Sequence, residues 1–203
     1  MSKANVYIID DDVVILNLYS NLLEHKDYKI ITYNSAHKFL KEYDDSIPSC
    51  AIIDINMAEI DGLKLFREMK SLNILIPSMF ISGSKDLDYI AELFREGAFD
   101  FIEKPYMRAD LMFSIIDNAL EYDKKESSKR KELLSCERMM GKLTDRERNV
   151  LNLLVIGNSA KVIAKVLNIS YRTVETHITN IKAKTQLDTV KLMGKLIYLK
   201  IHG

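Results

Sequence analysis

The sequence has few of the residues that cross-link small folds or bind zinc. It contains two cysteines in 203 residues, Cys50 and Cys136, and no Cys-x-x-Cys motif or His/Cys cluster. This scarcity argues against a disulfide framework and against a zinc site. Cys50 precedes an apolar run, so we expect it in the core. A reducing cytoplasm is the expected compartment.

Long hydrophobic runs are also missing. No apolar run approaches the roughly 20 residues of a membrane-spanning helix. The acidic residues Asp10, Asp11 and Asp12 follow Met1 too closely to leave room for a signal peptide. We therefore expect neither a secretion signal nor a membrane partner.

The sequence has no net charge, but its two halves are oppositely charged. Residues 1–123 contain 12 Lys/Arg and 22 Asp/Glu, a net charge of −10, and residues 124–203 contain 17 and 7, a net charge of +10. This reversal predicts two modules with different partners. The acidic half suits metal and phosphoryl chemistry, and the basic half suits a polyanion such as nucleic acid. Charge alone leaves open a merely solvated basic surface, or self-association of the two halves.

The first 121 residues alternate short apolar runs with helix-length amphipathic stretches. The runs are Val6–Ile9, Lys29–Tyr33, Ala51–Ile53, Ile76–Ile81 and Phe99–Ile102. Such runs can also be buried helix, but their length and β-branched content favour strands. The alternation predicts an α/β fold, in which a doubly wound, five-stranded parallel sheet of flavodoxin-like order 2-1-3-4-5 is covered by helices on both faces.

The remaining residues form a linker and a small helical domain in this interpretation. Residues 123–132 contain no apolar side chain, which predicts a linker or an exposed helical extension. From Leu143 onward the apolar spacing is helical, beginning with a capping box formed by Thr144 and Glu147. The predicted division is 1–122 for the α/β domain, 123–142 for the linker, and 143–203 for an all-α domain of four helices.

Two of these helices have the spacing of a helix-turn-helix. A helix over 160–167 is followed by a tight connection at 168–170 and by a third helix with Ser170 as its N-cap. Val174, Ile178 and Ile181 mark the buried face of that third helix. A fourth helix over 189–199 closes the chain. The pattern is typical of DNA-binding modules, although many small bundles share it.

Polar residues follow the ends of four predicted strands. They are Asp10 and Asp11, Asp54, Ser82, and Lys104. Parallel strands gather their carboxyl ends along one edge of a sheet, so these residues are expected to meet there. A single Asp at a strand end is usually a helix cap or a turn former, but four such ends in order are hard to explain by coincidence.

The expected chemistry of this edge is phosphoryl transfer on a divalent cation. Asp10, Asp11 and Asp54, with the Asn56 backbone carbonyl, offer the oxygen ligands that Mg²⁺ prefers. Asp54 is the candidate nucleophile that would accept the phosphoryl group. Lys104 would pair with a phosphoryl oxygen and Ser82 would donate a hydrogen bond to another.

Residues 1–121 resemble the receiver domain of two-component response regulators. The resemblance is carried by the segments 8–12, 54–57, 61–63, 82–83, 97–101 and 104–105. It implies that a sensor histidine kinase phosphorylates Asp54, that the peptide bond between Lys104 and Pro105 is cis, and that Phe101 and Ser82 act as switch residues. Ala58 departs from the pattern, because the family usually has proline there, and we expect a looser loop after Asp54.

Residues from about 143 to 203 resemble the LuxR-type helix-turn-helix of the NarL/FixJ class. Matching residues include the segments 143–147, 163–164, 169–170 and 173–177, together with Asn180 and Lys184. Thr185 departs from the pattern, since a large apolar residue is usual there. The two resemblances together imply a transcription regulator that binds promoter DNA and is controlled by phosphorylation.

The candidate DNA contacts follow from the exposed face of the third helix. Glu175, Thr176 and Thr179 are placed to read bases. The candidate contacts with DNA phosphates are Lys161, Arg172, Lys182 and Lys184. Thr173 and Asn180 are further candidate DNA-binding residues. A homodimer on two half-sites is expected when the protein is active, with the fourth helix, which includes Val190, Met193, Leu196 and Ile197, as a dimer face, a core helix or both.

Two other functional classes compete with this interpretation. A Mg²⁺-dependent phosphohydrolase of the haloacid dehalogenase type also uses an Asp nucleophile and a Lys, but it needs an Asp-x-Asp motif after its first strand. A regulator or interaction module that works without phosphorylation is the other. Whether the α/β domain would mask the DNA-binding helix or dimerise is open on the sequence alone.

Overall fold

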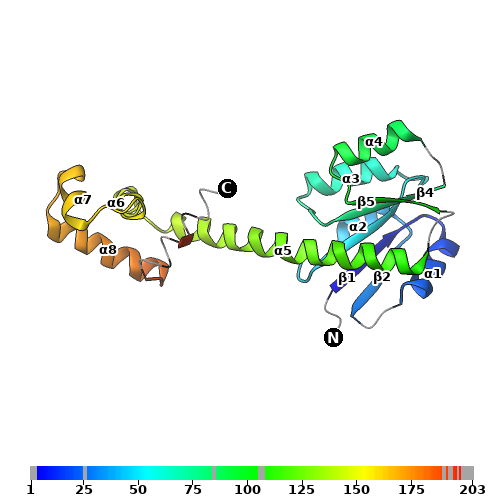
Figure 1. Cartoon of the computed structure of the whole chain (residues 1–203), viewed down its shortest axis with the longest axis horizontal. Coiled ribbons are helices and arrows are strands. Elements are labelled where there is room, and N and C mark those ends of the chain that lie inside the picture. The colour runs from blue at the N-terminus through cyan, green and yellow to red at the C-terminus, as the bar shows by residue number, and fades with distance from the viewer. Residues whose placement is uncertain are drawn as a thin grey trace. The chain divides into compact units, whose positions relative to one another are not determined.

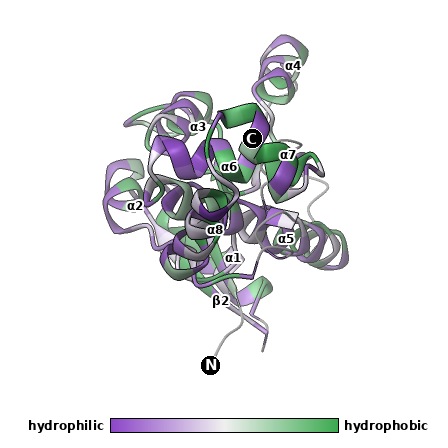
Figure 2. Ribbon diagram, turned by 90° about the vertical axis from the view of Figure 1, so that its left-hand side faces the viewer, coloured by the Kyte–Doolittle hydropathy of each residue, from purple (hydrophilic) through white to green (hydrophobic). Residues whose placement is uncertain are grey.

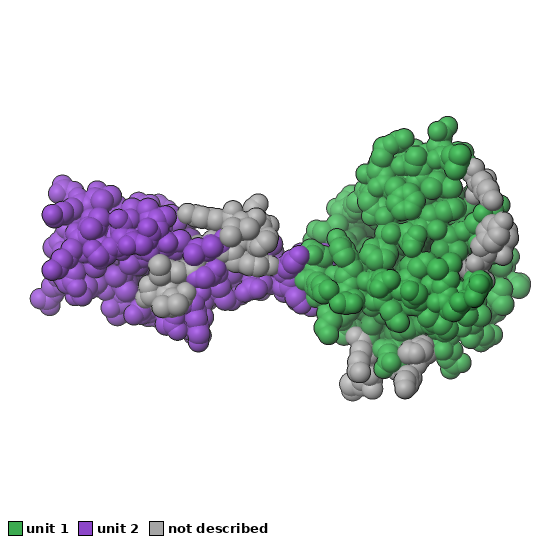
Figure 3. All heavy atoms as spheres, viewed as in Figure 1, with its two compact units in different colours: residues 1–127 green, residues 128–203 purple. Residues whose placement is uncertain are grey.

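The computed structural model describes residues 4–24, 27–83, 86–104, 108–188, 191, 194, 195 and 197. These residues fall into two compact units, 1–127 and 128–203 (Figure 3). Among them, no helix combines the length and the apolar character that a bilayer span requires.

Unit 1 is built on a five-stranded parallel sheet (Figure 1). The strands are β1 (Ala4–Ile9), β2 (Tyr28–Tyr33), β3 (Ser49–Asp54), β4 (Ser78–Ser82) and β5 (Asp100–Glu103). Their order is β2-β1-β3-β4-β5, which confirms the predicted flavodoxin-like topology. Every residue of β1 and β3 is buried, as expected for central strands covered on both faces.

Helices cover both faces of this sheet. They are α1 (Val13–Leu22), α2 (Ala36–Glu42), α3 (Gly62–Ser71), α4 (Leu87–Arg95) and α5 (Ala109–Gly141). Apolar residues of α2, α3 and α4 pack on one face of the sheet, and those of α1 and α5 pack on the other. The ribbons of α2, α3 and α4 carry both hydrophilic and hydrophobic residues, as helices with one exposed and one buried face should (Figure 2).

Polar side chains fix where four of these helices begin. Asp12, Ser35, Asp61 and Asp86 each accept a hydrogen bond from a main-chain N–H of the first turn. Each therefore satisfies an otherwise unpaired donor, in extended backbone geometry. Asp12 is thus a helix cap, which separates its role from that of Asp10 and Asp11.

Helix α5 continues through the segment predicted as a linker or a helical extension. It is one helix of 33 residues. Its residue Asp123 is only 3% exposed, and the carboxylate Oδ2 accepts a hydrogen bond of 2.9 Å from the main-chain N–H of Ser49. The start of the presumed linker is thereby anchored to the first residue of β3, which composition alone did not reveal.

Unit 2 contains α6 (Asp145–Val155), α7 (Ala160–Leu167) and α8 (Tyr171–Thr185). Thr144 and Glu147 form the predicted capping box, and Ser170 is the N-cap of α8. Asn168 takes the left-handed conformation, with φ of 52°, and closes the turn between α7 and α8. The predicted helix over 189–199, with Val190, Met193 and Leu196, lies mostly outside the described residues.

A small core holds these three helices together. It includes Val150, Leu151, Ile163, Val174 and Ile181, all at most 2% exposed. Ile178 is partly buried against the same cluster. The predicted buried face of α8 is therefore confirmed, and its other face is exposed. Thr185 is also buried and turns its hydroxyl onto the Ile181 carbonyl at 2.8 Å, so its polar group is satisfied.

Candidate functional site

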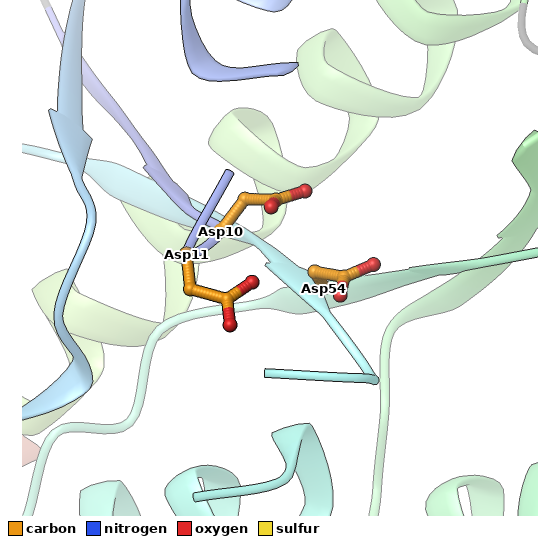
Figure 4. A group of neighbouring side chains, drawn as sticks. All are labelled: Asp10, Asp11 and Asp54. Atoms are coloured by element: carbon orange, nitrogen blue, oxygen red, sulfur yellow. The ribbon is translucent and has the colours of Figure 1, made fainter. Parts of the chain in front are cut away.

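Three carboxylates converge at the carboxyl edge of the sheet (Figure 4). Asp10 and Asp11 follow β1, and Asp54 ends β3. Because β1 pairs directly with β3, with Ile9 opposite Ile53, the two strand ends are neighbours. One oxygen from each carboxylate lies within 4.8 Å of the others. The structure therefore assembles the three acidic residues that the sequence pattern grouped.

Main-chain N–H groups hold each carboxylate in place. Asp10 Oδ1 accepts from the N–H of Asp12 at 2.9 Å, and Asp54 Oδ2 accepts from that of Asn56 at 3.0 Å. Asp11 Oδ2 accepts from the N–H of Ala58 at 2.7 Å. Asp10 and Asp54 are 2% and 5% exposed, whereas Asp11 is exposed to solvent. The backbone thus orients one oxygen of each group.

Lys104 supplies the positive charge of the site. Its Nζ lies 2.8 Å from Asp54 Oδ1 and 3.5 Å from Asp10 Oδ2. Burial opposes the lysine's charge, but the hydrogen bond and charge of Asp54, with the charge of Asp10, raise its pKa above the ordinary value. Burial, and then the charge of Asp54, raise the pKa of Asp10. One ammonium faces three carboxylates, so the site retains an excess of negative charge.

The donor set suits a divalent cation. Asp10 Oδ2 is fully buried, and its ion-pair partner Lys104 Nζ lies 3.5 Å away, at the limit of a hydrogen bond, so this oxygen can accept a further partner. All the available donors are hard oxygens, the type that Mg²⁺ selects. The residues present therefore fit the metal that the acidic pattern predicted.

Two other predicted site residues, Ser82 and Phe101, lie on the neighbouring strands β4 and β5. Ser82 ends β4 and is 1% exposed, and the Asn56 side-chain amide lies 3.5 Å from its hydroxyl oxygen. Phe101 lies on β5, partly buried against the core on the α4 side of the sheet. Pro105 lies outside the described residues, and so does its predicted cis bond to Lys104.

A glycine next to the site was quoted in the sequence pattern without a role. A Cβ on Gly62 would come within 2.8 Å of the Asp54 main-chain oxygen and 3.1 Å of the Ile55 Cα. The start of α3 can therefore approach the end of β3 this closely only because residue 62 has no side chain. A Cβ on Gly83, by contrast, would meet nothing within 4 Å, so space does not require glycine there.

A second residue that the sequence did not single out is Tyr89 on α4. Its hydroxyl accepts from the Leu63 N–H at 3.0 Å and donates to Asp61 Oδ1 at 3.1 Å, which ties α4 to the start of α3. Burial raises the pKa of Tyr89 to about 12, so the hydroxyl stays protonated and can donate. A cavity of about 140 Å³ lies beside it, lined by Ile55, Asn56, Asp61, Ser82, Asp86, Tyr89 and Ile90.

The exposed face of α8 presents most of the predicted DNA contacts. Exposed on it are Arg172, Glu175, Thr176, Thr179, Asn180 and Lys182, and Lys161 is exposed on α7. The hydroxyls of Thr176 and Thr179 each donate to the main-chain carbonyl four residues earlier, at 3.0 Å. Their methyl groups and oxygen lone pairs are what a base could meet. Thr173 belongs to the cap, with its hydroxyl 2.7 Å from that of Ser170.

Lys184, which the sequence predicts as a phosphate contact, pairs with an acidic side chain of unit 2. Its Nζ lies 2.7 Å from Oε2 of Glu147, whose side chain is 4% exposed. Burial opposes ionisation of Glu147, but hydrogen bonds from Lys184 and Thr144 outweigh it and hold the pKa of that carboxyl below its usual value. The structure thus uses Lys184 to neutralise a buried acid that links α6 to α8.

Two protein families match the two halves of the chain. Residues 6–116 match the family described as "Response regulator receiver domain". Residues 141–189 match "Bacterial regulatory proteins, luxR family". The two matches coincide with the acidic site and with the helix-turn-helix, respectively.

Similar proteins extend over nearly the full length. The chain is 30% identical over 202 residues to the transcriptional regulatory protein TdiR of Thauera aromatica, covering all of this chain and 87% of that protein. It is 32% identical to the transcriptional regulatory protein FixJ of Rhizobium meliloti, covering 100% and 98%. Among solved structures, response regulator StyR matches with a TM-score of 0.82 at 26% identity, covering 97% of this chain and 99% of that one. Full-length FixJ from B. japonicum matches with a TM-score of 0.58 at 26% identity, and both chains are covered completely.

Proposed function

Because this chain belongs to the response regulators that join a receiver domain to a LuxR-type DNA-binding domain, and so regulates transcription under the control of phosphorylation, we propose that Asp54 is the residue that receives the phosphoryl group. The observation that supports this most strongly is the position of Asp54. It is the carboxylate that ends a central strand, shares Lys104 with Asp10, and has an oxygen 2.8 Å from the lysine.

The donor of the phosphoryl group is a phosphohistidine of a sensor histidine kinase in this proposal. A carboxylate oxygen of Asp54 attacks the phosphorus, the P–N bond breaks, and the imidazole leaves with its electron pair and takes up a proton from solvent. Two protein groups then contact the transferred phosphoryl. Lys104 moves its contact from Asp54 Oδ1 to a phosphoryl oxygen, and Ser82 donates a hydrogen bond to another.

Asp10, Asp11, Asp54 and the Asn56 carbonyl would hold Mg²⁺ in this site. When bound, the ion would offset the negative charge that builds up on the oxygens around phosphorus. The protein's own part is to fix the carboxylates through main-chain N–H groups, so that little reorganisation accompanies the reaction. Hydrolysis of the acyl phosphate by water would release inorganic phosphate and return Asp54 to its starting state.

The output of this switch is DNA binding through α8. Glu175, Thr176 and Thr179 face the bases in this proposal, and Arg172 and Lys182 contact phosphates, with Lys161 and Asn180 at the margin. One helix reads only a short half-site, so the active form is a homodimer on two half-sites. We place the receiver at 1–122, the linker at 123–142 and the DNA-binding domain at 143–203.

Phosphorylation of the full chain by a small-molecule donor such as acetyl phosphate tests the site assignment. Wild type should gain one phosphoryl group by mass spectrometry, only with Mg²⁺ present, and lose it under mild base, as acyl phosphates do. Asp54→Asn should gain none, and Asp12→Asn, which changes only a helix cap, should behave as wild type. Phosphorylation that persists in Asp54→Asn would refute the assignment. Sustained turnover of a phosphate ester would instead favour a phosphohydrolase.

A further inference from the structure

The loop that follows the phosphoacceptor strand is tied to the acidic site by the backbone of Ala58. Its N–H donates to Asp11 Oδ2 at 2.7 Å, across 47 residues of sequence. We expected a looser loop here, because alanine leaves φ free where proline would fix it. The structure shows the other consequence of that substitution: alanine has an N–H, and this N–H is bonded to a candidate metal ligand.

Contacts on both sides of residue 58 keep this N–H directed at Asp11. Two residues earlier, the N–H of Asn56 donates to Asp54 Oδ2 at 3.0 Å. One residue later, Glu59 Oε2 accepts from the Ser35 hydroxyl at 2.9 Å, and its Oε1 contacts the His37 ring. These bonds anchor the loop to β3 and to the start of α2. The loop therefore holds residue 58 in place without the fixed φ that proline would give.

Asp11 is the carboxylate of the three that most needs such a partner. Asp10 and Asp54 are almost fully buried and their rotamers are restricted by packing, whereas Asp11 is exposed. An exposed Asp side chain samples several rotamers unless a bond selects one. A hydrogen bond to a carboxylate is charge-assisted and therefore stronger than a neutral one. The Ala58 bond is also to one oxygen only, which leaves the other for a cation.

We propose that the Ala58 N–H is a positioning group for the divalent cation, because it holds Asp11 in its ligating orientation before the ion arrives. The inference rests on the Mg²⁺ site proposed above. Outer partners of metal ligands typically change metal affinity by about 10- to 100-fold when they are removed. Since Asp11 is exposed and can be re-bonded by water, we expect the lower end, about tenfold.

Replacement of one atom tests this proposal. An ester in the backbone at position 58, made by incorporating lactic acid in place of Ala58, removes the N–H and keeps the methyl group and the chain length. Ala58→Pro removes the same N–H by ordinary mutagenesis. Ala58→Ser keeps the N–H and is the matched control. Titration of the metal-free full-length proteins with MgCl₂ by calorimetry gives the dissociation constant without any phosphorylation step.

The expected result is a dissociation constant about tenfold higher for the ester and for Ala58→Pro, and within about twofold of wild type for Ala58→Ser. A metal-free readout accompanies it: the Ala58 amide should exchange with solvent faster in Asp11→Ala than in wild type. If wild type binds Mg²⁺ and the ester binds it equally well, the role of Ala58 is refuted. If wild type binds no Mg²⁺, the proposed metal site itself fails.

Discussion

Two lysines two positions apart on α8 should lose different properties when each is replaced by methionine. Lys184 lies 2.7 Å from the buried carboxylate of Glu147, and Lys182 is exposed on the face assigned to DNA. Replacement of either by methionine keeps most of the side-chain volume and removes the charge. Lys184→Met should destabilise unit 2, and Lys182→Met should weaken DNA binding.

The size of the stability effect follows from burial. Removing one partner of a fully buried ion pair costs about 3 to 5 kcal/mol, because the other charge is left uncompensated. Here the Glu147 side chain is 4% exposed but that of Lys184 is 37% exposed, and two bonds from Thr144 to Glu147 remain. Solvent screening therefore reduces the expected loss to about 2 kcal/mol.

The pH dependence gives a second measure of the same pair. The pKa of Glu147 is held below its ordinary value of 4.5 in the folded protein, so unfolding takes up a proton in acid. The stabilisation is complete above about pH 4.5 and is lost as the pH falls through the folded pKa. Lys184→Met should weaken this loss, because without the lysine the folded pKa lies nearer the unfolded one.

Hydrogen exchange in urea, read by mass spectrometry on α6 and α8, reports the stability of unit 2 within the full chain. The salt dependence of DNA binding reports phosphate contacts: Lys182→Met should reduce the slope of log K against log salt by about 1, and Lys184→Met should leave it unchanged. Wild-type hydrogen exchange in Lys184→Met, together with a lowered salt slope, would contradict the role of Lys184 as the partner of Glu147.

Two further predictions concern unit 1. Gly62→Ala should destabilise it by about 1 to 3 kcal/mol in urea unfolding and slow phosphorylation of Asp54, because the new Cβ would lie 2.8 Å from that residue's main-chain oxygen; wild-type stability and rate would contradict this. Asp123→Ala should cost about 1 to 3 kcal/mol, since it leaves the buried Ser49 N–H unpaired. Asp123→Asn keeps an acceptor, so it should lose less stability than Asp123→Ala. If hydrogen exchange of the Ser49 amide speeds up equally in the two variants, the hydrogen bond from Ser49 to Asp123 does not provide this stability.

The receiver site was predictable because its information is local and periodic. Short apolar runs fix where strands end, and parallel topology then brings those ends to one edge whatever their separation in sequence. The meeting of Asp10, Asp54 and Lys104 could therefore be predicted without any knowledge of pairwise contacts. The caps at Thr144 and Ser170 were likewise readable from residue type and spacing.

Long-range partners of charged side chains were not predictable in this way. Asp123 begins a run of polar residues whose composition predicts exposure to solvent. Its carboxylate nevertheless accepts a hydrogen bond from the main-chain N–H of Ser49, 74 residues away. Lys184 shares its helix with exposed cations, and only the fold brings it to Glu147, 37 residues earlier. Ala58 in place of proline predicts a less rigid loop, because alanine leaves φ free. The sequence does not show that the N–H gained with alanine bonds to Asp11.

In the function proposed above, phosphorylation of Asp54 controls DNA binding by α8. Footprinting of promoter DNA by the full chain, with and without acetyl phosphate and Mg²⁺, measures this most directly. Wild type should shift its half-saturating concentration by about tenfold on phosphorylation, within the usual range of coupling between two sites. Asp54→Asn should show no shift. An unchanged footprint for fully phosphorylated wild type, or an equal shift in Asp54→Asn, would contradict control of DNA binding by Asp54.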